Sequence, residues 1–169
     1  MKNFRLNTKR LFISEFTLDD APFILEIVNT PGWLEFIGDK KIHTLSDAEN
    51  YLSTGPIKSY SEHGFGLFNV SDKNSDISVG ICGLIKRDFL GFPDLGFALL
   101  PNYEGVGFAF EASKHVLDYA ENELSIPSIY AITTPTNIKS QNLLIKLGFL
   151  RKENIKNDGE SLSLFELNF

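Results

Sequence analysis

The sequence predicts a mixed α+β domain with one central, mostly antiparallel sheet and about four helices around it. Two features of the chain lead to this fold class. In the middle of the chain, apolar segments of strand length are separated by polar turns, which is typical of an antiparallel meander. In the C-terminal half, strand-like and helix-like segments alternate. The length of 169 residues suits one domain, so we expect a single domain over residues 1–169.

The composition argues against several classes of partner and site. Hydrophobic residues make up 43% of the chain, enough for a buried core, and the formal net charge of −6 disfavours binding to nucleic acid or to an anionic membrane. Cys82 is the sole cysteine, and His43, His63 and His115 are too far apart for a local metal-ligand motif. No run of about 18 apolar residues is present. We therefore expect a cytoplasmic protein without a metal site, a disulfide or a membrane span.

The N-terminal third is predicted to hold one strand and two helices. The largely apolar run Arg10–Phe16 is typical of a strand. The first helix is expected to begin at Thr17 and to end at Pro31-Gly32. A second helix is predicted over Asp47–Tyr60, with a break at Gly55-Pro56.

The rest of the chain is predicted to form the antiparallel meander and then alternating helices and strands. The strands of the meander are Phe65–Val70, Ile77–Ile85 and Asp94–Leu100. They are followed by a helix over Phe110–Leu124, a strand over Ser128–Thr134, a helix over Asn137–Leu147 and a closing strand over Leu162–Phe169. In both helices the apolar residues recur at the spacing of one helix face.

A glycine-rich turn between a strand and a helix is the most informative segment. Gly105 and Gly107, followed by the small Ala109, allow the backbone to turn tightly and to aim several N–H groups outward at the start of the helix. Such a turn binds phosphate, although an ordinary strand-to-helix turn has the same pattern. Phe110 stands where a dinucleotide-binding fingerprint has its third glycine, which disfavours a Rossmann site.

A second motif is the helix that is opened by Asn137 and closed by Leu147-Gly148-Phe149. Together with the glycine-rich turn it resembles the GCN5-related N-acetyltransferases (the GNAT superfamily), and more narrowly the branch that contains the RimJ/RimL-type enzymes. The resemblance covers nearly the whole chain. Further segments fall in order where that branch has comparable residues: Thr8-Lys-Arg10-Leu11, Thr17-Leu-Asp-Asp20, Gly80-Ile-Cys-Gly83, Asp94-Leu-Gly96-Phe97, Leu100-Pro101, Tyr103 and Glu111-Ala112.

The resemblance implies a GNAT fold with a twisted sheet, in which two strands splay apart to admit acetyl-CoA. The pantetheine arm would insert like an extra strand between Ser128–Thr134 and the strand that carries Phe97, Ala98 and Leu99. The pyrophosphate would lie on the turn, whose N–H groups come from Gly105, Val106, Gly107, Phe108 and Ala109. Glu104 departs from the Gln or Arg of the family, so its carboxylate is expected to point away from the pyrophosphate.

The resemblance also implies roles in cofactor binding and catalysis. Asn137 matches the asparagine that bonds the cofactor arm, and asparagine is equally a common helix N-cap. Ser140 matches a serine near the thiol in the RimJ/RimL branch, where it is either an acid for the leaving thiolate or a solvated helical serine. Many members have a tyrosine acid where this chain has Leu144, so that role is excluded. Asp94 matches an acidic residue of the branch and is either the base, directly or through a water, or a turn residue at a strand end.

The region expected to select the acceptor lies in the N-terminal third. Residues 31–39 hold two aromatic and two acidic residues in a predicted loop, namely Trp33, Phe36, Glu35 and Asp39. The two aromatic side chains either contact the acceptor or pack the loop against the core. The two acidic side chains would suit a cationic acceptor.

We therefore expect an acetyl-CoA-dependent N-acetyltransferase that moves an acetyl group to a primary amine by direct attack. The acceptor would be a protein N-terminal α-amine or a small-molecule amine, and no nucleic acid or membrane partner is expected. The protein would be a monomer or a homodimer. The alternative from another class is a catalytically silent acyl-CoA-binding sensor or interaction module, which Glu104 and Leu144 favour. A third alternative is a nucleotide-binding domain with an unrelated Gly-x-Gly turn.

Overall fold

The central sheet contains all the strands of the part of the chain that the structure describes. The structure is a computed structural model, and it describes residues 5–169. The strands are β1 (Arg5–Asn7), β2 (Leu11–Glu15), β3 (Leu67–Asp72), β4 (Ile77–Ile85), β5 (Asp94–Leu99), β6 (Ser128–Thr133), β7 (Leu150–Asn157) and β8 (Glu160–Asn168). They form one eight-stranded sheet in the order β1-β2-β3-β4-β5-β6-β8-β7. Each neighbouring pair is antiparallel except β5 with β6, which confirms the predicted fold class.

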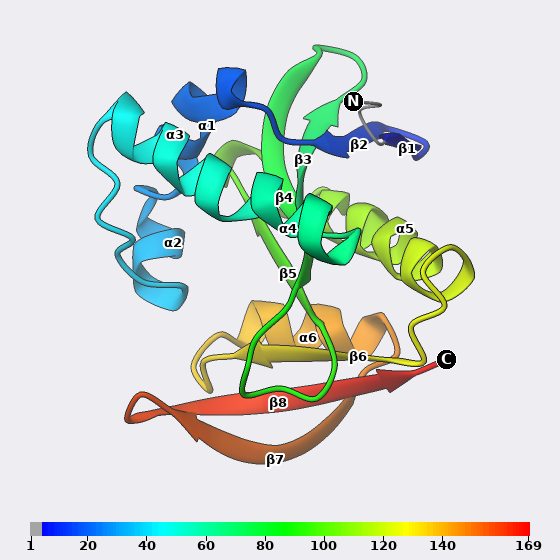
Figure 1. Cartoon of the computed structure of the whole chain (residues 1–169). Coiled ribbons are helices and arrows are strands. Elements are labelled where there is room, and N and C mark those ends of the chain that lie inside the picture. The colour runs from blue at the N-terminus through cyan, green and yellow to red at the C-terminus, as the bar shows by residue number, and fades with distance from the viewer. Residues whose placement is uncertain (1–4) are drawn as a thin grey trace.

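Helices cover both faces of this sheet (Figure 1). They are α1 (Ala21–Ile27), α2 (Pro31–Phe36), α3 (Leu45–Thr54), α4 (Pro56–His63), α5 (Phe108–Asn122) and α6 (Ile138–Lys146), with two short 3₁₀-helices, η1 (Leu18–Asp20) and η2 (Pro101–Tyr103). The helices α1 to α4 lie over one face of the first half of the sheet, and α5 lies over the other face. The helix α6 packs against the half that contains β6 and β7.

Two hydrophobic clusters form the core between the helices and the sheet. The larger cluster joins α5 and α6 to the sheet, and its buried members include Phe68, Val116, Leu144, Phe149 and Phe165. The smaller cluster joins α1, α2 and α3 to the opposite face, and its buried members include Ile24, Ile27, Trp33, Leu52 and Ile81. Because each fully buried large apolar side chain contributes about 1.5–3 kcal/mol, these clusters hold the helices in fixed positions around the sheet.

The strands β5 and β6 separate along their length. Their ladder contains a single register pair, Asp94 with Tyr130, and the N–H of Tyr130 donates to the carbonyl of Pro93 at 2.9 Å. Beyond this pair β5 leaves β6, and the two strands diverge toward their C-terminal ends (Figure 1). The predicted splayed pair is therefore present. Its open end is the one from which β5 leads into the glycine-rich turn.

The prediction for Pro31-Gly32 was wrong. The first helix ends earlier, at Ile27, and Pro31 is the first residue of the separate helix α2. Proline suits this position because its fixed φ is helical and its missing N–H has no acceptor in a first turn. Trp33, Glu35 and Phe36 consequently lie on a helix instead of in the predicted loop.

The number of helices and the bounds of the outer strands also differ from the prediction. The helix predicted over Asp47–Tyr60 is present as α3 and α4, and the predicted break at Gly55-Pro56 is confirmed. The described residues form six α-helices where about four were expected. The strand β7 was not predicted, because six of its eight side chains are exposed and it lacks the alternation of a half-buried strand. The three-residue strand β1 is too short to show a pattern.

Candidate functional site

The gap between β5 and β6 exposes backbone hydrogen-bonding groups of β5. Leu100 donates its N–H to the carbonyl of Val79 at 2.9 Å, in register with the ladder between β4 and β5. Because hydrogen-bonded and non-bonded pairs alternate along an antiparallel ladder, Phe97 and Leu99 turn their N–H and C=O groups toward β6. The polar backbone groups of Ala98 face β4 instead. In the gap, β5 can therefore pair with an extended ligand through Phe97 and Leu99.

The glycine-rich turn lies beside this gap and leads into α5. Gly105 and Gly107 have φ angles of +77° and +87°, which side chains rarely adopt. The helix begins at Phe108, and the N–H groups of its first turn have no intrahelical acceptor. They lie at the positive end of the helix dipole, so the segment from Gly105 to Ala109 can bind an anion such as a diphosphate.

Arg10, in the connection between β1 and β2, bonds to the glycine-rich turn and to the first turn of α5, and so forms a brace between them. Nε of Arg10 lies 2.7 Å from Oε2 of Glu111 in the first turn of α5, and Nη1 of Arg10 donates to the carbonyl of Val106 at 2.8 Å. The hydroxyl of Thr8 donates to the other carboxylate oxygen of Glu111 at 2.5 Å. Sequence reasoning missed this brace, although Thr8, Arg10 and Glu111 all belong to segments shared with the resembled branch.

Glu104, at the start of the turn, points toward α6. Its Oε2 lies 3.7 Å from Nζ of Lys139, whose side chain is 92% exposed, while that of Glu104 is 48% exposed. An exposed ion pair of this kind contributes about 0–1 kcal/mol, so it orients the carboxylate more than it stabilises the fold. The pairing is consistent with the expectation that Glu104 turns away from the anion site.

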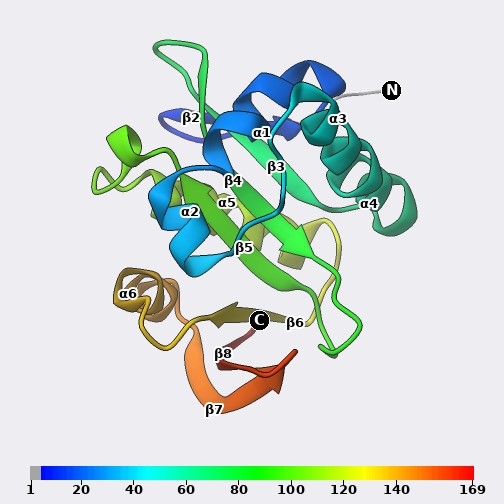
Figure 2. The same cartoon turned by 90° about the vertical axis from the view of Figure 1, so that its left-hand side faces the viewer.

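The start of α6 lies next to the end of β6, on the other side of the gap (Figure 2). Oδ1 of Asn137 accepts the N–H of Ser140 at 3.2 Å, so Asn137 is the helix N-cap. This bond leaves the Nδ2 group of Asn137 as a donor for a ligand. Ser140 is half-buried on the first turn. Leu144, at the position where many family members have a tyrosine acid, is buried in the larger cluster, so its side chain packs in the core.

A buried polar network that the sequence did not reveal fixes the turn before α6. Nε2 of Gln141 donates to the carbonyl of Pro135 at 2.9 Å, and its Oε1 accepts from Arg151 at 3.3 Å. Arg151 also donates to the hydroxyl of Ser163 at 3.2 Å. Because Gln141 is buried and hydrogen-bonded on both sides of its amide, it holds the chain that presents Asn137.

Asp94 lies at the closed end of the gap, where β5 and β6 still pair. Its side chain is 2% exposed, and Oδ1 lies 2.9 Å from Nε of Arg87. Burial raises the pKa of Asp94 to about 6, and the Arg87 cation offsets this effect only in part. A carboxyl group with this pKa is mostly ionised at pH 7 and can still accept a proton, as a general base must.

The four residues expected at the acceptor have different surroundings. Trp33 is 5% exposed and packs in the smaller cluster, so its ring supports α2 from the core side. Phe36 is half-buried and Glu35 is exposed. Oδ2 of Asp39, in the loop after α2, lies 2.9 Å from Nζ of Lys41. A direct contact of any of the four with an acceptor stays a prediction.

A cavity of about 300 Å³ lies between α5 and α6. Phe110, Lys114, Leu117 and Asp118 line it from α5, and Lys146 lines it from α6. Nζ of Lys146 is 4.7 Å from the centre of the Phe110 ring.

In the described residues, no three or more His, Cys, Asp or Glu side chains are arranged to hold a metal ion. None of the helices in this part of the chain is both long and apolar enough to cross a bilayer.

Known proteins resemble this chain in sequence and in fold. A family model described as an acetyltransferase (GNAT) domain matches residues 10–150. The chain is 29% identical over 157 residues to the uncharacterized N-acetyltransferase p20 of Bacillus licheniformis, covering 92% of this chain and 86% of that protein. It shares its fold with the crystal structure of an acetyltransferase from Agrobacterium tumefaciens, with a TM-score of 0.84 and 20% identity over 100% of this chain and 96% of that one. The fold is also similar to that of RimL, a ribosomal L7/L12 alpha-N-protein acetyltransferase in complex with coenzyme A. The superposition covers 98% of this chain and 98% of that one, with a TM-score of 0.84 and 11% identity.

Proposed function

The chain belongs to the GNAT family of acetyltransferases, and from this premise we propose that it moves the acetyl group of acetyl-CoA to a primary amine by direct attack. The observation that carries the proposal is the open gap between β5 and β6, which lies beside the anion-binding turn at the start of α5. We place the chain in the RimJ/RimL-like branch, with a protein N-terminal α-amine or a small-molecule amine as acceptor. The motifs shared with that branch support this assignment.

The described residues fit acetyl-CoA at three places. The N–H groups from Gly105 to Ala109 suit the diphosphate. The backbone groups of Phe97 and Leu99 that face the gap suit the amides of the pantetheine arm, and Nδ2 of Asn137 suits one of its carbonyl groups. Bound acetyl-CoA supplies an activated acetyl thioester. Lys114 and Lys146, which line the cavity between α5 and α6, suit its phosphorylated ribose.

The residues around the gap then have distinct tasks in the transfer. An α-amine with an ordinary pKa is about 10–15% neutral at pH 7, so it needs little help from a base. Asp94 accepts the proton that leaves the amine nitrogen, directly or through a water. The N–H of Phe97 stabilises negative charge that develops on the carbonyl oxygen. Ser140 donates a proton toward the leaving sulfur.

A thermal-shift titration with acetyl-CoA, free CoA and NAD tests the cofactor. Ligand at a hundredfold excess over its dissociation constant raises the apparent free energy of unfolding by about 2.7 kcal/mol. We expect both CoA compounds to raise the melting temperature and NAD to leave it unchanged. If none of the three raises it, the turn is misassigned and the proposed acetyl-CoA site is wrong.

Turnover is tested separately, by the release of free CoA thiol in the presence of a panel of amines. Thiol release that depends on an amine supports the proposed transfer. Tight binding of acetyl-CoA without amine-dependent release from any acceptor would favour the catalytically silent sensor instead. The absence of a tyrosine at Leu144 is the feature that motivates this comparison.

Arg10→Ala is expected to weaken acetyl-CoA binding about tenfold although Arg10 is proposed to touch no part of the cofactor. The substitution removes the side-chain bonds to Glu111 and Val106, so the turn loses part of its support. Ordering the turn then costs some of the binding free energy. Isothermal titration calorimetry measures the affinity, with Lys9→Ala as the exposed neighbouring control. Equal affinities of the two variants would show that the brace does not position the turn.

A further inference from the structure

Among the described residues, Arg87 is the one side chain that bonds the carboxylate of Asp94. Its Nε donates to Oδ1 of Asp94 at 2.9 Å. The side chain of Asp94 is 2% exposed, whereas that of Arg87 is 35% exposed. Burial takes away the water that would stabilise the charge of a carboxylate, so the adjacent guanidinium must supply this stabilisation. The charge of the proposed base therefore depends on a residue that reaches it from the protein surface.

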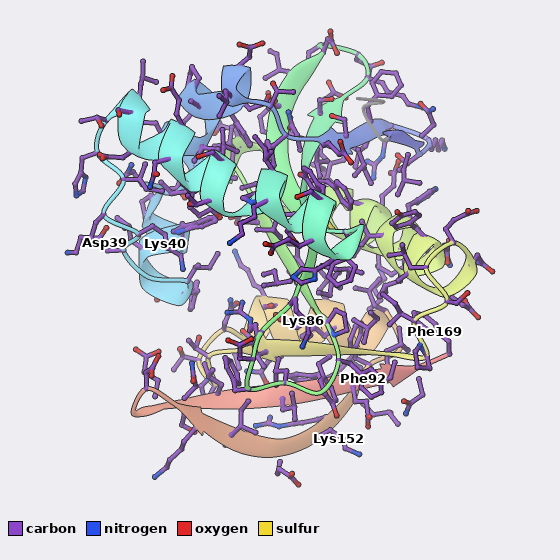
Figure 3. All side chains as sticks on the ribbon, viewed as in Figure 1. Asp39, Lys40, Lys86, Phe92, Lys152 and Phe169 are labelled. Carbon is purple, nitrogen blue, oxygen red and sulfur yellow. The ribbon has the colours of Figure 1, made fainter. Side chains whose placement is uncertain are left out.

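The connection between β4 and β5, residues 86–93, holds Arg87 in place. The N–H of Leu90 donates to the carbonyl of Arg87 at 3.3 Å, and the side chain of Leu90 is buried. Further along, the ring centre of Phe92 lies 5.8 Å from that of Tyr130 on β6. Figure 3 shows Phe92 on this connection, in front of β6. Because a buried leucine and an aromatic contact anchor the connection, it presents Arg87 from a fixed backbone.

Other titratable side chains near the pair come from several elements. Some are placed there by the strand register or by their position next to Arg87 in the chain, and others by their response to the charge of Arg87. They are Tyr130 of β6, Tyr51 of α3, Lys40 in the loop after α2, and Lys86 and Asp88 of the connection. None of these side chains bonds Asp94, so within the described residues Arg87 alone pairs with its carboxylate.

The two carboxylate oxygens of Asp94 have different surroundings. Oδ1 accepts the bond from Arg87, and Oδ2 receives no bond from another of the described residues. Oδ2 is therefore the oxygen that remains for a proton from the amine or from a bridging water. The bond to Arg87 also restricts rotation of the carboxylate, because a turned carboxylate would leave a buried charge unpaired.

We propose that Arg87 is a positioning residue for the acetyl transfer, which keeps the buried Asp94 carboxylate ionised and holds Oδ2 ready for the reacting amine. The proposal rests on the proposed function and deepens it. In the proton transfer, the amine nitrogen gives up one proton, Oδ2 takes it, and the carboxylate becomes a neutral carboxylic acid. The guanidinium keeps its charge throughout and touches neither the amine nor the cofactor.

The sign of the expected effect follows from this pairing. Burial raises the pKa of Asp94 to about 6 although Arg87 opposes the increase. An opposite charge nearby lowers the pKa of a carboxyl group by about 1–3, so removal of the cation should raise the pKa of Asp94 further. At neutral pH the carboxylic acid would then become the main form. That form has no charge to accept the proton of the amine.

The test compares the pH dependence of kcat/KM in the wild type and in Arg87→Met. Methionine fills similar space, and a protonated Asp94 is neutral, so the variant should fold. Each variant rate is divided by the wild-type rate at the same pH, which cancels the ionisation of the amine. We expect the acidic inflection to move from near pH 6 to about pH 7 or above. The relative rate should then rise about threefold or more between pH 6.5 and pH 9.

Two matched variants separate the charge of Arg87 from other effects. Arg87→Lys keeps the charge, so its inflection should stay within about half a pH unit of the wild type. Lys86→Met removes the exposed neighbouring charge and should leave the inflection unchanged. The proposal is overturned by an unchanged inflection in Arg87→Met or by a loss of rate that is equal at every pH. An equal displacement of the inflection in either matched variant would also overturn it.

A second measurement does not depend on turnover. The carbon-13 resonance of the Asp94 carboxyl group is identified by its absence from the spectrum of Asp94→Asn. It should titrate at a higher pH in Arg87→Met than in the wild type, and equal titration would contradict the proposal. A displaced titration without a displaced rate profile would place the pair outside the reaction. Failure of acetyl-CoA to raise the melting temperature would instead contradict the proposed function, so the two failures are distinguishable.

Discussion

Ala109→Asp is expected to abolish measurable acetyl-CoA binding while the folded protein stays at least as stable. Ala109 is the second residue of α5, where the helix dipole favours a carboxylate by about 0.3–1 kcal/mol. The same carboxylate would lie against the diphosphate of the cofactor. Two like charges about 4 Å apart repel by about 4 kcal/mol at an effective dielectric constant of 20, which is a loss of affinity of about a thousandfold.

The matched control for this variant is Ala109→Asn, which has nearly the same size and no charge. We expect it to lose about tenfold in affinity, because the larger side chain crowds the turn without repelling the ligand. Isothermal titration with acetyl-CoA gives the two affinities, and thermal unfolding of the free variants gives their stabilities. Similar affinities for the Asp and Asn variants would mean that the diphosphate binds elsewhere.

Asp94→Asn is expected to lower kcat/KM by about 10² to 10⁴-fold and to leave acetyl-CoA affinity unchanged. If Asp94 is the base, only its ionised form is active. The activity of the wild-type enzyme should then rise with pH through an inflection near pH 6, which is the pKa that burial gives to Asp94. The variant should lack this inflection. A pH–rate profile with the same acidic limb in both proteins would remove Asp94 from the role of base.

The same substitution should change how stability depends on pH. The pKa of Asp94 is raised from 3.8 to about 6 in the folded protein, so between these pH values the folded state keeps a proton that the unfolded state has released. The free energy of unfolding therefore falls as pH rises through this window, by roughly 3 kcal/mol for this one group. Urea unfolding at pH 4.5 and pH 8 measures the change in each protein. We expect the decrease to be smaller in Asp94→Asn, and an equal decrease would show that Asp94 titrates normally.

Local patterns in the sequence were sufficient for most of the elements that form the cofactor site. The strand β4 was predicted with its observed bounds, Ile77–Ile85, and Asn137 was recognised as a possible cap of the helix that became α6. Periodicity and capping depend on neighbouring residues, so they can be read without the fold. The strand β7 was not predicted because its exposed side chains show no periodic burial. Pro31 was interpreted as a helix end, although proline is equally suited to a helix start.

The charges around the reaction centre could not be predicted in this way. Arg10 and Glu111 are 101 residues apart in the chain, so no local pattern links them. The sequence by itself determined the family, the glycine-rich turn and the strand that faces the gap. Only the tertiary structure decided that Asp94 is buried and that Arg10 pairs with Glu111, because burial and Coulomb interactions depend on distances in space, which spacing along the chain does not determine.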